Sequence, residues 1–331
     1  MYYKILKIMI KAKTNNTYIL IFYLLIFLSF SSLSFSQRKT IPFHLDERNR
    51  IILEYTIKGE KVNLFFDTGT SENFIDINFS DKVDFLPHKK NMKFTFKTIS
   101  DITLNLIQPD SLYKTDCVFN GGWSLTDMNE TRKLLNLGDN VNGIVGINYA
   151  FFKDVVEINF KNKKLYIWDS FPKKYLNHAK MLQVKIVRSD DGHKTKYSDL
   201  WSKYPYIKSS FTIADSIHLN PLFCLDTGCT PYAAIAVYDS LLFTTLMEHK
   251  KNITEKYGIN YPTTRLQLPE LGIDSSYVSI SAIPPFHTDK EKSDIVGTKK
   301  IEGLLGMGFF IKYEIVLFDC MNKIGYFIKR E

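Results

Sequence analysis

Two copies of the tripeptide Asp-Thr-Gly constrain the fold of this 331-residue chain more than any other feature. Asp67-Thr68-Gly69 follows the apolar run 62–66, and Asp226-Thr227-Gly228 follows the apolar run 222–225. A Gly-aliphatic-aliphatic-Gly segment comes next in each copy, beginning 76 positions after Asp67 and 77 positions after Asp226. This matched spacing predicts an internal repeat that contributes one candidate carboxylate from each copy.

The residues around each aspartate suit a rigid loop that presents a carboxylate. An apolar strand fixes the start of the loop, a glycine lets the backbone turn, and neighbouring hydroxyls can hold the carboxylate by hydrogen bonds. Two such carboxylates brought together can share a proton and activate a water for peptide hydrolysis. The candidate catalytic residues are Asp67 and Asp226, the supporting loop residues are Thr68, Gly69, Thr70, Ser71, Thr227, Gly228, Cys229 and Thr230, and the candidate packing segments are Gly143-Ile144-Val145-Gly146 and Gly303-Leu304-Leu305-Gly306.

Taken together, these motifs resemble the aspartic proteases of the pepsin and retropepsin class. Asp67-Thr68-Gly69-Thr70-Ser71 and Asp226-Thr227-Gly228 match that family's two active-site loops, and the two glycine-bounded segments match its hydrophobic-hydrophobic-glycine motif. The stretch 306–325 is similar to the C-terminal end of pepsin-like enzymes, and the resemblance covers about residues 40 to 331.

The resemblance implies a mostly β, bilobal fold of two lobes related by a pseudo-twofold axis, with a few short helices. It implies that Asp67 and Asp226 share one proton and hold the attacking water, one carboxylate acting as base and the other as acid. Thr68 and Thr227 would cross-link the two loops through backbone hydrogen bonds. We expect Ile144, Val145, Leu304 and Leu305 to be buried beneath the loops, and we expect neither a cofactor nor a metal.

Three features depart from the family pattern, and one of them is that each lobe is shorter than a pepsin lobe and nearer the retropepsin scale. Cys229 stands where many pepsin-like loops carry a hydroxyl residue, whereas Thr70 keeps one in the first copy. The flap that closes over substrate is not clearly marked. The hairpin tip at 97–101 lies at a plausible distance from Asp67, and Asn120-Gly121-Gly122-Trp123 is the other candidate; Trp123 is equally well explained as a core residue.

The N-terminus is typical of a secretory signal peptide. Lysines precede an uncharged apolar run from Ile19 to Phe30, and Ser34-Phe35-Ser36 offers small residues for cleavage before Gln37. We expect residues 1–36 to be this signal, residues 37–175 to form an N-terminal β lobe with Asp67, and residues 176–331 to form a C-terminal β lobe with Asp226. The expected location is periplasmic or secreted; the alternative is an uncleaved N-terminal membrane anchor.

Charge and cysteine content limit the partners. The formal net charge is +8, but four of the lysines precede residue 37, so the remainder carries only +4. That value gives little reason to expect nucleic acid or an anionic membrane as a partner. Four cysteines, Cys117, Cys224, Cys229 and Cys320, allow three complete disulfide pairings, and their uneven placement suggests one bridge at most within the second half.

We therefore expect an exported, monomeric aspartic endopeptidase whose partner is a peptide or protein substrate, with membrane contact only through an uncleaved N-terminal segment. The alternative function is a catalytically weak or inactive relative that binds extended polypeptide in the cleft between the lobes. A structural or assembly protein of the cell envelope is a third possibility. Loss of one aspartate would favour either alternative, and both aspartates are present.

Local patterns predict several elements. Alternation and turn signals predict hairpins over 51–66, over 92–107 and over 211–225. Spaced apolar residues predict helices over Leu125–Leu137 and over Tyr238–His249.

Overall fold

The computed structural model describes residues 37–70, 73–86, 93–97, 103–107, 119, 123–146, 154–186, 205–213, 217–237, 239–248, 253–256, 259–268, 271, 273–281 and 301–330. Residues Gln37–Glu331 form one compact unit. The expected signal peptide, Ser71, Cys117 and the candidate flap residues 98–101 and 120–122 lie outside the described residues. Within those residues, no helix has the length and apolar character needed to cross a membrane.

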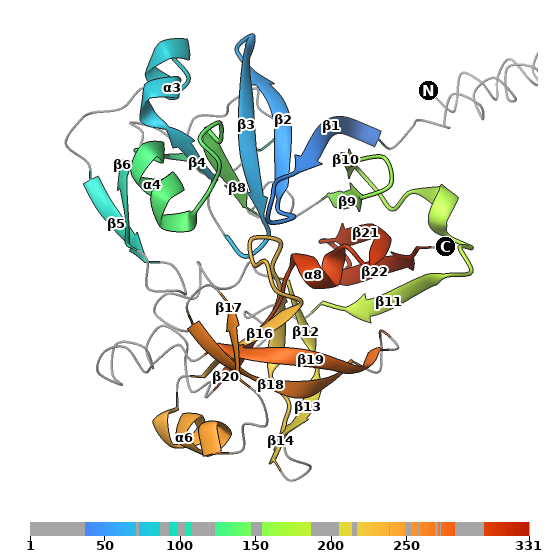
Figure 1. Cartoon of the computed structure of the whole chain (residues 1–331). Helices are drawn as coiled ribbons and strands as arrows, with labels where there is room; N and C mark the ends of the chain where they lie inside the picture. The colour runs from blue at the N-terminus through green and yellow to red at the C-terminus, as the bar shows by residue number, and fades with distance from the viewer. Residues whose placement is uncertain are drawn as a thin grey trace, which may run out of the picture. The chain divides into compact units, whose positions relative to one another are not determined.

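Strands dominate the described residues, as expected for a mostly β protein (Figure 1). The larger sheet has the strand order β11-β22-β21-β9-β10-β1-β2-β3-β8-β4-β7-β6-β5. Its strands are β1 Gln37–Leu45, β2 Ile51–Ile57, β3 Glu60–Asp67, β4 Asn73–Asp76, β5 Lys93–Lys97, β6 Thr103–Ile107, β7 Trp123–Thr126, β8 Gly143–Gly146, β9 Val155–Asn159, β10 Lys164–Trp168, β11 Met181–Lys185, β21 Tyr313–Asp319 and β22 Ile324–Lys329.

The smaller sheet consists of strands from the second half of the chain. Its order is β12-β15-β20-β16-β19-β18-β13-β14, and β17 pairs with β18. The strands are β12 Tyr206–Lys208, β13 Ser210–Ile213, β14 Ile217–Leu219, β15 Leu222–Leu225, β16 Ala233–Val237, β17 Ile253–Lys256, β18 Ile259–Leu268, β19 Ile273–Ser281 and β20 Ile301–Leu305.

Short helices interrupt the strands: α3 Ile77–Val83, α4 Met128–Leu135, α6 Ser240–Glu248, α8 Met307–Phe310 and the 3₁₀ turn η2 Lys173–Tyr175. The prediction of a helix from Leu125 was wrong at its start, because residues 123–126 form strand β7. Asp127 then caps α4, accepting a hydrogen bond from the Asn129 amide at 2.8 Å. The helix predicted near 238–249 is present as α6.

The same local topology occurs around both Asp-Thr-Gly loops. In the first copy β3 pairs in parallel with β8, and β8 pairs antiparallel with β4. In the second copy β15 pairs in parallel with β20, and β20 pairs antiparallel with β16. The strand that enters each loop and the strand that leaves it are therefore held by the glycine-bounded segment of the same copy.

The larger sheet joins the two halves of the chain. Strand β21, from the C-terminal region, pairs antiparallel with β9, and β22 continues the sheet to β11 (Figure 1). The division expected at 175/176 falls just after η2, in the connection between β10 and β11. Strands from both sides of that point share one sheet, and this pairing fixes the two halves relative to each other.

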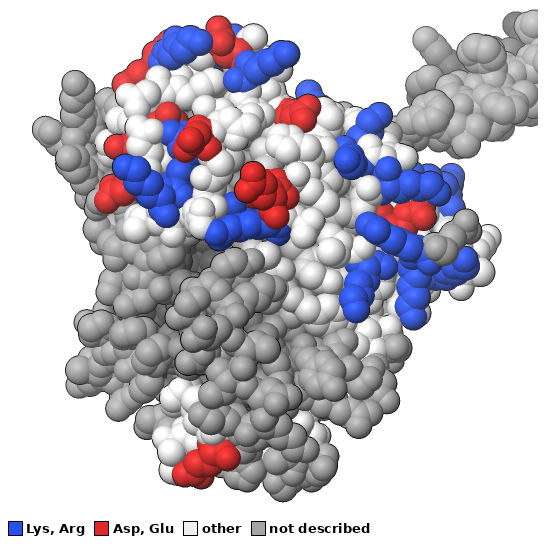
Figure 2. Space-filling model, in the orientation of Figure 1, with Lys and Arg blue, Asp and Glu red and all other residues white. Residues whose placement is uncertain are grey.

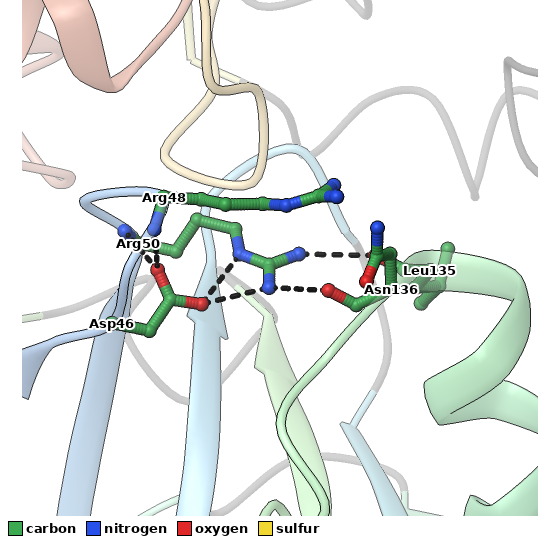
Figure 3. Close-up of polar contacts among 5 residues, drawn as sticks. All are labelled: Asp46, Arg48, Arg50, Leu135 and Asn136. Atoms are coloured by element: carbon green, nitrogen blue, oxygen red, sulfur yellow. Dashed lines mark hydrogen bonds and ion pairs between the residues drawn. The ribbon is translucent and has the colours of Figure 1, made fainter. Parts of the chain in front are cut away.

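A buried arginine ties the β1–β2 turn to the end of α4 (Figure 3). Arg50 donates to the carbonyls of Leu135 and Asn136 at 3.0 and 2.7 Å, while Asp46 accepts from its Nε at 2.8 Å. The last carbonyls of a helix have no partner within the helix, so the guanidinium satisfies them and its positive charge suits the negative end of the helix dipole. This contact fixes the start of the connection from α4 to β8.

Trp123 is a core residue at the start of β7. Its side chain is 4% exposed, its Nε1 donates to the Phe119 carbonyl at 3.1 Å, and its ring packs edge-on against Phe85. The interpretation of Trp123 as part of the core is therefore the one that its surroundings support.

Candidate active site

The two Asp-Thr-Gly loops have nearly identical hydrogen bonding. Gly69 N donates to Asp67 Oδ1 at 2.8 Å, and Gly228 N donates to Asp226 Oδ1 at 2.8 Å. The next amide closes a tight turn in each loop, from Thr70 to the Asp67 carbonyl and from Cys229 to the Asp226 carbonyl, both at 3.2 Å. Each loop therefore orients its own carboxylate through its backbone.

Two buried threonines cross-link the loops. Thr68 N donates to Thr227 Oγ1 at 3.0 Å, and Thr227 N donates to Thr68 Oγ1 at 2.9 Å. The hydroxyls in turn donate to the carbonyls that precede the opposite aspartate: Thr227 Oγ1 to Phe66 at 2.9 Å, and Thr68 Oγ1 to Leu225. Both threonines are fully buried, so these four bonds form a closed network away from water.

This network brings the two carboxyl groups face to face. A hydrogen bond joins the side chains of Asp67 and Asp226. A Cβ added to Gly69 would lie 2.5 Å from Asp226 Cγ, and one added to Gly228 would lie 2.5 Å from Asp67 Cγ. Each glycine therefore leaves the space that the opposite carboxyl group occupies.

The glycine-bounded segments lie against the loops, as the repeat predicts. A Cβ on Gly146 would lie 2.2 Å from the Thr70 carbonyl oxygen, and one on Gly306 would lie 2.4 Å from the Cys229 carbonyl oxygen. Ile144, Val145 and Leu305 are buried. The expected burial of Leu304 was wrong: this residue is only half-buried and packs against the small Tyr206–Cys224 cluster.

The two carboxyl groups differ in their environment. Burial raises the pKa of both aspartates, and the charge of Asp67 and its hydrogen bond raise that of Asp226 further, well above its usual value. The contacts that lower the pKa of Asp67 are, in order of size, the side chain of Asp226, the Gly69 amide, the Thr70 side chain and the Gly228 amide; those that lower the pKa of Asp226 are the backbone amides of Gly228 and Cys229. Burial and mutual charge therefore favour a pair that keeps one proton.

Cys229 carries a free thiol beside the pair. Burial, then the charges of Asp226 and Asp67, raises its pKa well above the usual value, so the thiol stays protonated at neutral pH. Its backbone amide donates to Asp226 Oδ1 at 3.1 Å. Among the described cysteines, Cys224 and Cys320 are buried thiols, and no disulfide joins them to Cys229 or to each other.

Sequence reasoning missed Asn73, at the start of β4 just after the first loop. Its side chain is fully buried, and its Oδ1 accepts from Gly146 N at 3.1 Å. It therefore connects the strand that leaves the first loop to the end of β8. A polar residue directly before the apolar pair Phe74-Ile75 was the available signal.

The contact between each glycine and the opposite carboxyl group predicts a clear effect on stability. Gly69→Ala and Gly228→Ala should each lower the free energy of unfolding by about 1–3 kcal/mol, because the new methyl group must displace a carboxyl group held by several hydrogen bonds. Urea unfolding of residues 37–331 measures this. Gly138→Ala is the matched control, since the nearest atom to its Cβ is the mobile end of Asn140 at 3.1 Å. Equal stability of all three variants would contradict the geometry.

Comparisons with known proteins add no assignment: the chain matches no protein-family model and no characterised protein.

Proposed function

We propose that this protein is an exported aspartic endopeptidase with a bilobal, pepsin-like fold, in which Asp67 and Asp226 activate the water that hydrolyses a peptide bond. The observation that carries the proposal is the hydrogen-bonded pair of carboxyls on two loops cross-linked by Thr68 and Thr227. The repeated pairing of β3 with β8 and of β15 with β20 supports the pseudo-twofold arrangement.

The asymmetry of the pair supports an assignment of roles. Asp67, with the Thr70 hydrogen bond, is the ionised base that takes a proton from the attacking water. Asp226 is the acid that gives its proton to the carbonyl oxygen of the substrate as the water oxygen bonds to the carbonyl carbon. When the tetrahedral intermediate collapses, the carbon–nitrogen bond breaks and a proton passes to the leaving amine through the pair, which returns to its single-proton state.

The test is cleavage of a denatured-protein mixture by residues 37–331 between about pH 3 and 7, with and without pepstatin. We expect pepstatin-sensitive cleavage that Asp67→Asn and Asp226→Asn both abolish. Undiminished cleavage by either variant would overturn the proposal. Retention of an extended polypeptide without cleavage would instead identify the protein as a binding relative.

The thiol of Cys229 predicts a specific pH effect. A hydroxyl at this position would donate to Asp226 more strongly than a thiol does, and so would favour the ionised carboxylate. Because Asp226 is the proposed acid, Cys229→Thr and Cys229→Ser should therefore move the alkaline limb of the kcat/KM profile to lower pH. Cys229→Ala supplies no side-chain donor and is the control, expected to leave that limb in place or move it to higher pH. Coinciding profiles for the wild type and the hydroxyl variants would disprove the effect.

A further inference from the structure

Basic side chains are concentrated on one part of the surface. Figure 2 shows Lys and Arg gathered over the region where Figure 1 draws β10, η2 and β11, with few acids among them. Asp154, Glu157 and Asp319, on or beside the neighbouring strands β9 and β21, are buried, whereas Asp169, just after β10, is exposed. The modest net charge of the chain therefore hides a local excess, which we call the basic surface: Lys164, Lys173, Lys180, Lys185, Lys329 and Arg330, all exposed.

An exposed leucine lies within the lysine-bearing segment 173–180 of this surface. Leu176 directly follows η2, and its side chain is 61% exposed. The segment 173–180 holds three lysines and one histidine but no acid. Strand β11 begins at Met181 opposite Ile328, which brings Lys329 and Arg330 beside Lys180. Single exposed leucines are common on proteins, so the surrounding charge is what gives this one significance.

The segment is held rigidly from beneath. Lys174 lies over the rings of Trp168 and Tyr175, at 4.9 and 4.5 Å from their centroids, and 3.6 Å from a carboxylate oxygen of Glu157. Glu157 is fully buried and also accepts from Tyr175 OH at 2.7 Å and from Trp168 Nε1 at 2.9 Å. These hydrogen bonds and this ion pair fix η2. Leu176, which directly follows η2, is therefore held in an exposed position by an ordered segment.

We propose that the basic surface, together with the exposed Leu176, binds the anionic phospholipid surface of a membrane. Lysines attract anionic headgroups over about one Debye length, and an apolar side chain among them can enter the interface between headgroups and acyl chains. Gln37, the first residue that the structure describes, pairs with Trp168 beside the basic surface. This membrane contact would be a second route to the membrane, independent of an N-terminal anchor and of peptide hydrolysis.

Co-sedimentation of residues 37–331 with vesicles tests the proposal without the N-terminal segment. We expect binding to phosphatidylcholine vesicles that contain about 30% phosphatidylglycerol, and little binding to pure phosphatidylcholine or at high salt. Lys173→Gln with Lys180→Gln should weaken binding about tenfold, and Leu176→Ser about fivefold.

Matched controls separate the surface from general charge and hydrophobicity. Lys61→Gln with Lys133→Gln removes two exposed lysines elsewhere, and Leu241→Ser removes a leucine that is 76% exposed; both should bind as the wild type does. Absence of vesicle binding, or equal losses in the controls, would overturn the proposal. If Leu176→Ser binds normally while the lysine variant loses vesicles and a DNA duplex alike, the surface recognises polyanions such as nucleic acid and the membrane assignment is wrong.

Discussion

Asp67→Asn and Asp226→Asn should each lower kcat/KM on a peptide substrate by at least about 10³-fold, because the two carboxyl groups act only as a pair. The Asn side chain has nearly the same shape, so the loops should keep their cross-links. Steady-state kinetics with purified residues 37–331 measures the loss. Asp139→Asn, at an exposed position in the turn after α4, is the control and should retain full activity.

The variant Asp226→Asn should also change how the folding stability depends on pH. The folded-state pKa of Asp226 is raised, so the stability that its protonated form contributes is fully present below its ordinary pKa of 3.8 and is lost as the pH rises through the raised value. Asp226→Asn removes that titration. Its melting temperature should therefore fall less than that of the wild type between about pH 4 and pH 7. A steeper fall in the variant would show that the surroundings of Asp226 do not disfavour its ionised form.

Thr227→Val should lower the free energy of unfolding by about 2–4 kcal/mol. Valine has the same shape but removes the hydroxyl that donates to the Phe66 carbonyl and accepts from the Thr68 amide in a buried site. Thr68→Val should cost a similar amount, and the double variant should cost less than the sum, because both remove one shared network. Activity should fall with stability, since the threonines hold the carboxyl groups in register.

Urea unfolding of the single and double variants checks this expectation. Thr56→Val, at an exposed position of β2, is the matched control and should change stability by less than about 0.5 kcal/mol. Strict additivity of Thr68→Val and Thr227→Val would mean that the two hydroxyls act independently, contrary to the closed network.

Much of the candidate site could be predicted from the sequence because its signals are local. The hairpin β2–β3 and the strand that enters each aspartate were evident from apolar runs and turn residues. The glycine-bounded segments were recognisable because only glycine fits where the backbone of one strand approaches a loop so closely. Their nearly equal spacing from each aspartate indicated the repeat before any contact was known.

Other features depend on contacts between residues far apart in the chain. The apolar spacing from Leu125 suited a helix, but residues 123–126 pair with β4 and β6, and this pairing overrides the local preference. Leu304 is equivalent to Ile144 in the repeat, yet it is only half-buried, whereas Ile144 is buried. The net charge of the chain did not indicate the basic surface, because a total charge does not say where the charged side chains lie.

Local sequence patterns were enough to identify the residues of the candidate site: two aspartates, their glycines and threonines, and the segments that pack beneath them. The meeting of the two carboxyl groups in a buried site, where the pair favours keeping one proton, depends on contacts that form only in the fold. The physical reason is that residues 159 positions apart must be joined through Thr68 and Thr227 before burial and mutual charge can act on the pair. Local sequence patterns identify the residues of the site, whereas the desolvation of the two carboxyl groups and the Coulomb interaction between them arise only in the folded chain.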